Sequence, residues 1–163
     1  MHQEILFPRE KAALYPLLAQ QIAALAEDSQ PLSTLANASA LLYEALPDIN
    51  WAGFYLASGD MLHLGPFQGR TACMQIPFGR GVCGTAAATR QVQVVQDVQR
   101  FPGHIACDSA SRSEIVIPLH DGGGMPIGVL DIDSPVKSRF DGTDRRGLEK
   151  IAGLLEKVCQ WNG

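Results

Sequence analysis

Residues 114–133 read EIVIPLHDGGGMPIGVLDID, two alternating segments on either side of a glycine-rich turn. Alternation of apolar and polar residues with a period of two is typical of a strand with one buried face. Matching the two apolar faces predicts that Ile115 lies opposite Ile132, Ile117 opposite Leu130, and Leu119 opposite Gly128. We therefore expect an antiparallel hairpin whose register is set by its hydrophobic residues.

The same register makes a prediction at each end of the hairpin. Near the turn it pairs Asp121 with Pro126 and leaves a four-residue loop, a common hairpin length. At the far end it places Glu114 opposite Asp133, with Asp131 two residues along on the same face. Three carboxylates are therefore expected to converge at one end of the sheet.

Three converging carboxylates admit two interpretations. Like charges directly opposite each other destabilise a sheet by a few tenths to about 1 kcal/mol per pair, so the cluster is either a solvated strand end or a functional pocket. A pocket of this kind can bind a cation, or it can raise a carboxyl pKa until the group acts as an acid. Both uses suit an amino-acid ligand with a free ammonium group.

The rest of the chain shows an alternation of helical and strand patterns around this hairpin. We expect strands at 50–57 and 61–67, joined by the turn 58–60, and further strands at 73–78 and 92–95. We expect helices at 8–27 (one kinked helix or two short ones, because Pro16 lies inside it), from 32–34 to 46, at 82–88 and at 143–160. Helices flanking a mostly antiparallel sheet indicate an α+β fold.

Composition narrows the function further. The chain has 163 residues, 46% hydrophobic and 18% charged, which is typical of one globular domain spanning 1–163. A net charge of −4 without a Lys/Arg run argues against nucleic acid and against an anionic membrane surface as partners. The N-terminus lacks a signal-peptide pattern, and no apolar stretch is long enough to span a membrane. We therefore expect a cytoplasmic protein.

The four cysteines, Cys73, Cys83, Cys107 and Cys159, are expected to rest as thiols in that compartment, where a disulfide is usually transient and catalytic. Zinc sites usually show close Cys or His pairs, and here only His104 lies near Cys107, so no metal site is predicted.

The surroundings of the cysteines differ. Cys107 lies on a loop just before Glu114, and Cys83 lies beside Gly84 at an expected helix N-terminus, where the helix dipole would lower its thiol pKa. Each cysteine alone is more often a small buried hydrophobe. Together, Cys73, Cys83 and Cys107 offer a nucleophile and resolving partners, whereas Cys159 is most simply structural or surface-exposed.

Five runs carry a resemblance to a known family: NWAGFYL (50–56), LGPFQG (64–69), IPFGRGVCGTA (76–86), FPGHIACDSASRSEIVIPL (101–119) and GVLDIDSP (128–135). They resemble the free methionine-(R)-sulfoxide reductases of the GAF-domain superfamily over about residues 32–156. The resemblance implies a GAF-like six-stranded antiparallel sheet flanked by helices, usually in a homodimer, with the helical segment 1–30 preceding the core.

The resemblance also implies site residues. Cys107 matches the catalytic cysteine, Cys73 the resolving cysteine, and Cys83 an auxiliary disulfide partner. The substrate-binding positions correspond to Glu114, Asp131, Asp133, Trp51 and Tyr55. Trp51 and Tyr55, four apart on a strand and so on one face, would form an aromatic wall around the S-methyl group, although such residues are also ordinary core aromatics. No bound cofactor is expected; thioredoxin is the implied reductant, with NADPH upstream.

Sulfoxide chemistry is compatible with these residues. A thiolate attacks the sulfoxide sulfur, an acid protonates the oxygen, and a second thiol resolves the sulfenic acid as a disulfide. The carboxylates would suppress the Cys107 thiolate unless a substrate ammonium offsets them, which favours a free amino acid over a peptide.

Two other functions are compatible with the sequence. A non-catalytic GAF sensor of small molecules would generally sit beside an output domain, for which this chain leaves no room. A thiol redox sensor or peroxidase would be oxidised by peroxide, without preference for methionine sulfoxide.

Overall fold

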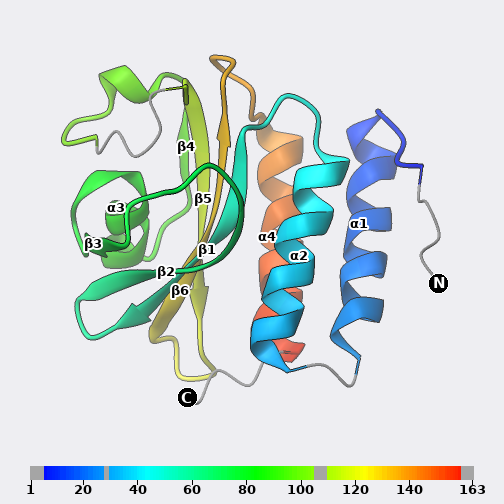
Figure 1. Ribbon diagram of the computed structural model, residues 1–163, viewed down its shortest axis with the longest axis horizontal. Coiled ribbons are helices and arrows are strands. Elements are labelled where there is room, and N and C mark those ends of the chain that lie inside the picture. The colour runs from blue at the N-terminus through cyan, green and yellow to red at the C-terminus, as the bar shows by residue number, and fades with distance from the viewer. Residues whose placement is uncertain (1–5, 28–29, 105–109, 159–163) are drawn as a thin grey trace.

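The computed structural model describes residues 6–27, 30–104 and 110–158. Six strands form one antiparallel sheet in the order β3-β2-β1-β6-β5-β4 (Figure 1). Their bounds are β1 (Trp51–Ser58), β2 (Met61–Gly69), β3 (Gln75–Pro77), β4 (Gln93–Val95), β5 (Ser113–His120) and β6 (Pro126–Ser134). The predicted α+β fold with a six-stranded antiparallel sheet is confirmed.

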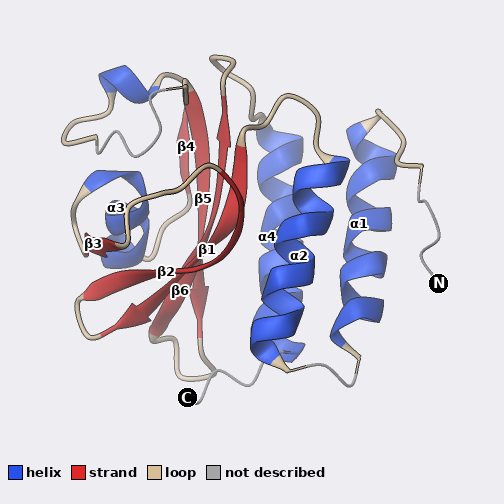
Figure 2. Ribbon diagram, viewed as in Figure 1, coloured by secondary structure: helices blue, strands red, loops and turns tan. Residues whose placement is uncertain are grey.

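Helices cover the sheet unequally. Three of them, α1 (Lys11–Ala26), α2 (Pro31–Ala45) and α4 (Gly142–Val158), lie together on one face, and α3 (Gly81–Thr89) lies on the other (Figure 2). The larger hydrophobic core fills the space between the three-helix layer and the sheet and includes Leu18, Leu42 and Ile132. The smaller core lies under α3 and contains Trp51, Tyr55 and Cys83. The predicted site residues in this second core therefore lie on the face that α3 covers.

The β5–β6 hairpin has the predicted register along most of its length. Ile115 pairs with Ile132, Leu119 with Gly128, and Glu114 with Asp133. Near the turn the prediction was wrong, because a bulge shifts the register and His120, not Asp121, pairs with Pro126.

Asp121 explains that shift. Its Oδ1 accepts hydrogen bonds from the backbone N–H groups of Gly123 (2.9 Å) and Met125 (3.0 Å). A carboxylate that holds its own turn in this way is a local alternative to ladder pairing. The turn therefore contains five residues, 121–125, and one extra residue of β6 is accommodated by the bulge.

The helix ends follow local sequence signals. Pro31 opens α2 at a position where a missing N–H costs nothing. Asp141 caps α4, because its Oδ1 accepts from the N–H groups of Thr143 and Asp144 at 3.0 Å each. The first helix is a single element that continues through the exposed Pro16, so the alternative of two short helices was wrong.

The strand expected at 73–78 is shorter than predicted. β3 spans only Gln75–Pro77 and pairs with Met61–His63 at the edge of the sheet. The chain before it is a loop fixed by other contacts, among them a hydrogen bond from Leu64 N to Met74 O (3.0 Å). Cys73 therefore belongs to that loop rather than to a strand.

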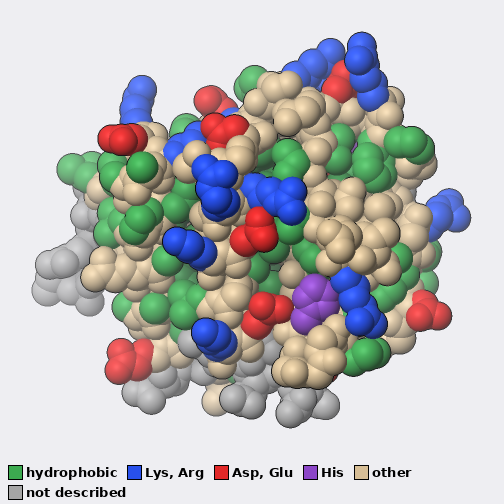
Figure 3. All heavy atoms as spheres, turned by 180° about the vertical axis from the view of Figure 1, so that it is seen from behind, with side chains coloured by type: hydrophobic (Ala, Val, Ile, Leu, Met, Phe, Trp, Pro, Cys, Tyr) green, Lys and Arg blue, Asp and Glu red, His purple; other side chains and the backbone are tan. Residues whose placement is uncertain are grey.

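The surface opposite to the view of Figure 1 shows Lys and Arg side chains intermixed with Asp and Glu side chains (Figure 3). In the described residues, Lys137 and Asp97 form an ion pair at 3.5 Å, and Arg145 and Glu149 form another at 3.0 Å. Within the described residues, no helix combines the length and the apolar character that crossing a membrane requires.

Candidate active site

One cleft brings most of the predicted site residues together. It lies between α3, the sheet and the loop that precedes β3. Six of the eight predicted residues line it: Trp51, Tyr55, Cys83, Glu114, Asp131 and Asp133. The cleft therefore combines two aromatic rings, one thiol and three acids.

The acids enter the cleft from adjacent strands. Glu114 on β5 lies opposite Asp133 on β6, and Asp131 lies two residues along the same strand. Glu114 and Asp131 are only 7% and 5% exposed, and Asp133 is half-buried. Among the described residues, Asp131 Oδ1 is buried and has no hydrogen-bond partner. Two carboxyl groups are thus held together with little access to water.

Burial of this kind changes proton affinity. Burial raises the pKa of Glu114 well above its ordinary value, and the nearby charges of Asp131 and Asp133 raise it further. Burial also raises the pKa of Asp131, although side-chain hydrogen bonds with Glu114 and Cys83 oppose that rise. Glu114 is therefore the carboxyl group best suited to keep a proton near neutral pH.

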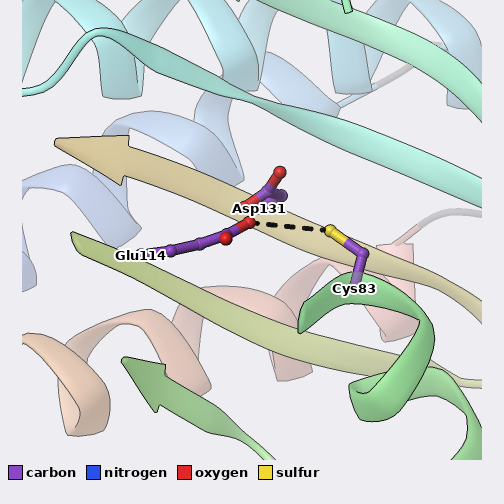
Figure 4. A group of neighbouring side chains, drawn as sticks. All are labelled: Cys83, Glu114 and Asp131. Atoms are coloured by element: carbon purple, nitrogen blue, oxygen red, sulfur yellow. Dashed lines mark hydrogen bonds between the residues drawn. The ribbon is translucent and has the colours of Figure 1, made fainter. Parts of the chain in front are cut away.

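Cys83 lies in the first turn of α3 and faces these acids. Its side chain extends from α3 toward Glu114 on β5 and Asp131 on β6 (Figure 4), and its Sγ lies 3.9 Å from Glu114 Oε2. Burial raises the pKa of the Cys83 thiol well above its ordinary value, and the neighbouring acids add to the rise. The prediction that the helix dipole would lower this pKa was wrong, because desolvation and negative charge outweigh the dipole.

Gly84 explains how α3 comes so close to the sheet. A Cβ atom at this position would lie 2.4 Å from the carbonyl oxygen of Pro77, well inside contact distance. The carbonyl of Gly84 also accepts a hydrogen bond from Gly79 N at 2.8 Å. The absence of a side chain at Gly84 lets the helix rest on β3, and this places Cys83 over the acids.

Two aromatic rings, those of Trp51 and Tyr55, form the wall of the cleft, and the ring of Phe67 packs against one of them. The rings of Trp51 and Tyr55 are stacked with centroids 5.9 Å apart, and Trp51 also stacks on Phe67 at 5.1 Å. Their polar ends are tied to the loop before β3: Trp51 Nε1 donates to Arg70 O (3.1 Å) and Tyr55 Oη donates to Cys73 O (2.9 Å). The wall and the Cys73 backbone therefore form one connected unit.

The four cysteines differ in how far the structure describes them and in their bonding. Cys73 is half-buried, takes part in a disulfide bond, and is not among the described residues that line the cleft. Cys107, the predicted nucleophile, lies outside the described residues, as does Cys159. Cys83 is a free, buried thiol.

Several cleft residues were not predicted. Arg80, His104, Ser111 and Thr71 also line the cleft, and burial lowers the pKa of His104. All four lie on loops, where no periodicity indicates which way a side chain points. Only their closeness in sequence to the cysteine motifs could have suggested them.

Comparison with known proteins identifies the family of this chain. The sequence profile of the GAF domain family matches residues 33–158. The chain is 60% identical to the free methionine-R-sulfoxide reductase of Escherichia coli strain K12 over 83% of this chain and 82% of that protein. It is 50% identical to the enzyme of the same name from Saccharomyces cerevisiae, over 77% of this chain and 73% of that protein.

A solved structure adds a fold-level match. The free methionine-R-sulfoxide reductase of Neisseria meningitidis, in complex with its substrate, superposes with a TM-score of 0.93 at 47% identity, covering 99% of this chain and 97% of that chain. Such identities over most of both sequences confirm the resemblance that the motifs predicted. The chain belongs to the free methionine-R-sulfoxide reductase family of GAF-domain proteins.

Proposed function

We propose that this protein reduces free methionine-R-sulfoxide to methionine in the cleft between α3 and the sheet. The observation that carries the proposal is the meeting of an aromatic wall with three acids in that cleft. Relatives named for this activity span most of the chain, which supports the same substrate here. Preference for the R epimer is taken from those relatives.

The proposed reaction uses the cysteines in two steps. In the first, the thiolate of Cys107 attacks the sulfoxide sulfur, and the sulfoxide oxygen takes up two protons and leaves as water. Water then cleaves the resulting S–S bond, which releases methionine and one proton and leaves Cys107 as a sulfenic acid, oxidised by two electrons. In the second, the thiol of Cys73 displaces that oxygen as water and forms a disulfide with Cys107. The ability of Cys73 to form a disulfide supports this role.

Glu114 is the proposed proton donor to the sulfoxide oxygen. Its buried position beside Asp131 and Asp133 raises its pKa, which keeps a proton available at neutral pH. The remaining carboxylates would receive the substrate ammonium, a charge that methionine sulfoxide lacks within a peptide. Trp51 and Tyr55 would pack against the S-methyl group.

Thioredoxin is the proposed reductant of the Cys73–Cys107 disulfide, with NADPH as the ultimate electron source. We propose no bound cofactor. Cys83 remains an auxiliary candidate for disulfide formation, although its raised pKa makes it a poor nucleophile while it stays buried. The homodimer that the family resemblance implies stays a prediction, which analytical ultracentrifugation tests.

The decisive experiment measures thioredoxin-coupled NADPH consumption with free R and S epimers of methionine sulfoxide. We expect turnover with the R epimer, none with a peptide-bound sulfoxide, and loss of turnover in Cys107→Ser. Cys73→Ser should still form one methionine per protein in a single turnover but fail to recycle with thioredoxin. Full steady-state activity in Cys107→Ser would refute the proposed nucleophile.

A further inference from the structure

The side chains of Cys83, Glu114 and Asp131 lie close enough together to act as ligands of one metal ion, a role that the proposed sulfoxide reduction does not use. A sulfur and one oxygen from each of the two carboxyl groups all lie within 4.8 Å of one another (Figure 4). We propose that the protein with Cys83 reduced binds one Zn²⁺, or a similarly soft divalent ion, between these three side chains. The proposed ligands do not include Cys73 or Cys107.

The spacing is close to what zinc requires. Zinc binds cysteine sulfur at about 2.3 Å and carboxylate oxygen at about 2.1 Å, so a sulfur and an oxygen ligand in tetrahedral geometry lie about 3.6 Å apart. The observed distance from Cys83 Sγ to Glu114 Oε2 is 3.9 Å. All three ligand atoms lie within 4.8 Å of one another, so side-chain rotation has to bring them to tetrahedral spacing around the ion.

The second observation is an oxygen that lacks a partner. Asp131 is 95% buried, and its Oδ1 accepts no hydrogen bond from any described residue. Within the described part of the chain, neither Asp131 nor Glu114 forms an ion pair with a Lys or Arg side chain. Buried carboxyl groups without such compensation are unfavourable, and a bound cation relieves that cost.

The donor set selects the kind of metal. A thiolate ligand favours zinc and cadmium over magnesium and calcium, which prefer oxygen ligands alone. Three protein ligands leave a fourth position, and the three residues all line the cleft, so that position is open to water or to Asp133. Structural zinc sites usually have four protein ligands, so a site with three protein ligands and one open position differs from them.

A consequence follows if the proposed function is correct. Zinc would occupy Glu114 and Asp131, the acids assigned to the sulfoxide oxygen and the substrate ammonium, so metal and substrate would exclude each other. Metal binding itself does not depend on the proposed function. An experiment can therefore refute zinc binding without refuting sulfoxide reduction, and the reverse.

The test uses the double variant Cys73→Ser/Cys107→Ser, which removes both thiols of the predicted redox pair and leaves Cys83 in place. Calorimetric titration with Zn²⁺ should show one bound ion, and Cd²⁺ should give an ultraviolet charge-transfer band for a single thiolate. Adding Cys83→Ser or Asp131→Asn should weaken binding at least about tenfold, since even groups that only support metal ligands contribute 10–100-fold. The matched change Cys159→Ser should leave binding unaltered.

Two results would overturn the proposal: no stoichiometric binding in the double variant, or binding that Cys83→Ser leaves intact. Circular dichroism of each variant distinguishes loss of the site from loss of the fold, and Asp131→Asn tests the site without altering the helix. Excess free methionine sulfoxide should weaken Zn²⁺ binding in the double variant. If excess methionine sulfoxide leaves the affinity for Zn²⁺ unchanged, the metal site is supported and the proposed position of the substrate is refuted.

Discussion

Glu114 on β5 lies directly opposite Asp133 on β6, so two acids face each other where a stable sheet would favour opposite charges. Asp131, two residues along β6, adds a third acid in the same cleft. The sheet tolerates this arrangement because a proton can remain on Glu114, whose pKa is raised by burial and by the two aspartates. The closeness of the three acids therefore makes Glu114 a candidate proton donor and also lowers the free energy of unfolding.

The first prediction concerns the pH dependence of catalysis. If Glu114 protonates the sulfoxide oxygen, the rate of single-turnover methionine formation should fall as pH rises through its raised pKa, because the donor loses its proton. Glu114→Gln should lower that rate by about 10²- to 10⁴-fold, the usual contribution of a general acid. In this variant, the rate of single-turnover methionine formation should no longer decrease as pH rises. A variant with the wild-type profile would show that another group supplies the proton.

The second prediction concerns stability and the same residue. A carboxyl group whose folded pKa lies above its unfolded value binds more protons in the folded state, so its contribution to stability is complete below the unfolded pKa and is lost as pH rises toward the folded pKa. The wild type should therefore lose free energy of unfolding as pH rises from the ordinary glutamate value of 4.5. Glu114→Gln should lack this part of the loss.

Urea unfolding at about pH 5 and about pH 8 measures that difference. We expect the free energy of unfolding of Glu114→Gln, relative to the wild type, to increase between the two pH values. Glu149→Gln, on the exposed side of α4, is the control and should show little change. A free energy of unfolding of Glu114→Gln that falls relative to that of the wild type as pH rises would contradict the raised pKa.

The acid cluster could be predicted because it depends on local periodicity. Ile115 and Leu130 alternate with polar neighbours, so only one register buries both apolar faces, and that register brings Glu114 to Asp133. The prediction failed near the turn, where Asp121 holds the backbone through its own side chain. Side-chain capping of a turn does not follow from alternation of hydrophobic residues.

The surroundings of Cys83 could not be predicted in the same way. Its sequence neighbours indicate a helix N-terminus, which favours a thiolate. Its actual pKa depends on β5 and β6, segments far along the chain that α3 meets only after folding. The contact of Trp51 with Phe67 and the position of Arg80 in the cleft likewise depend on tertiary packing.

The third prediction concerns the hydrogen bond between Tyr55 and Cys73. Tyr55→Phe keeps the ring of the aromatic wall but removes the hydroxyl that donates to Cys73 O at 2.9 Å. The free energy of unfolding should fall by about 0.5–1.5 kcal/mol. Recycling by thioredoxin should slow more than single-turnover reduction, because the loop that carries the proposed resolving thiol loses an anchor.

Rapid-quench and steady-state assays separate those two rates for Tyr55→Phe. The matched control is Tyr43→Phe, because Tyr43 is 40% exposed on α2, away from the cleft. It should leave both rates unchanged. Equal slowing of both steps in Tyr55→Phe would assign the hydroxyl to the substrate rather than to the Cys73 loop.

The fourth prediction compares two helical glycines. Alanine at Gly84 would place its Cβ 2.4 Å from the carbonyl oxygen of Pro77, so α3 must move away from β3 and carry Cys83 off the acids. Gly153 in α4 has open space around its Cβ position, and alanine there should stabilise the helix by about 0.5–1 kcal/mol. Thermal unfolding should therefore show opposite shifts for Gly84→Ala and Gly153→Ala. Single-turnover activity should fall only in Gly84→Ala. If Gly84→Ala keeps the stability and the rate of the wild type, close contact between α3 and β3 is not what positions the cleft residues.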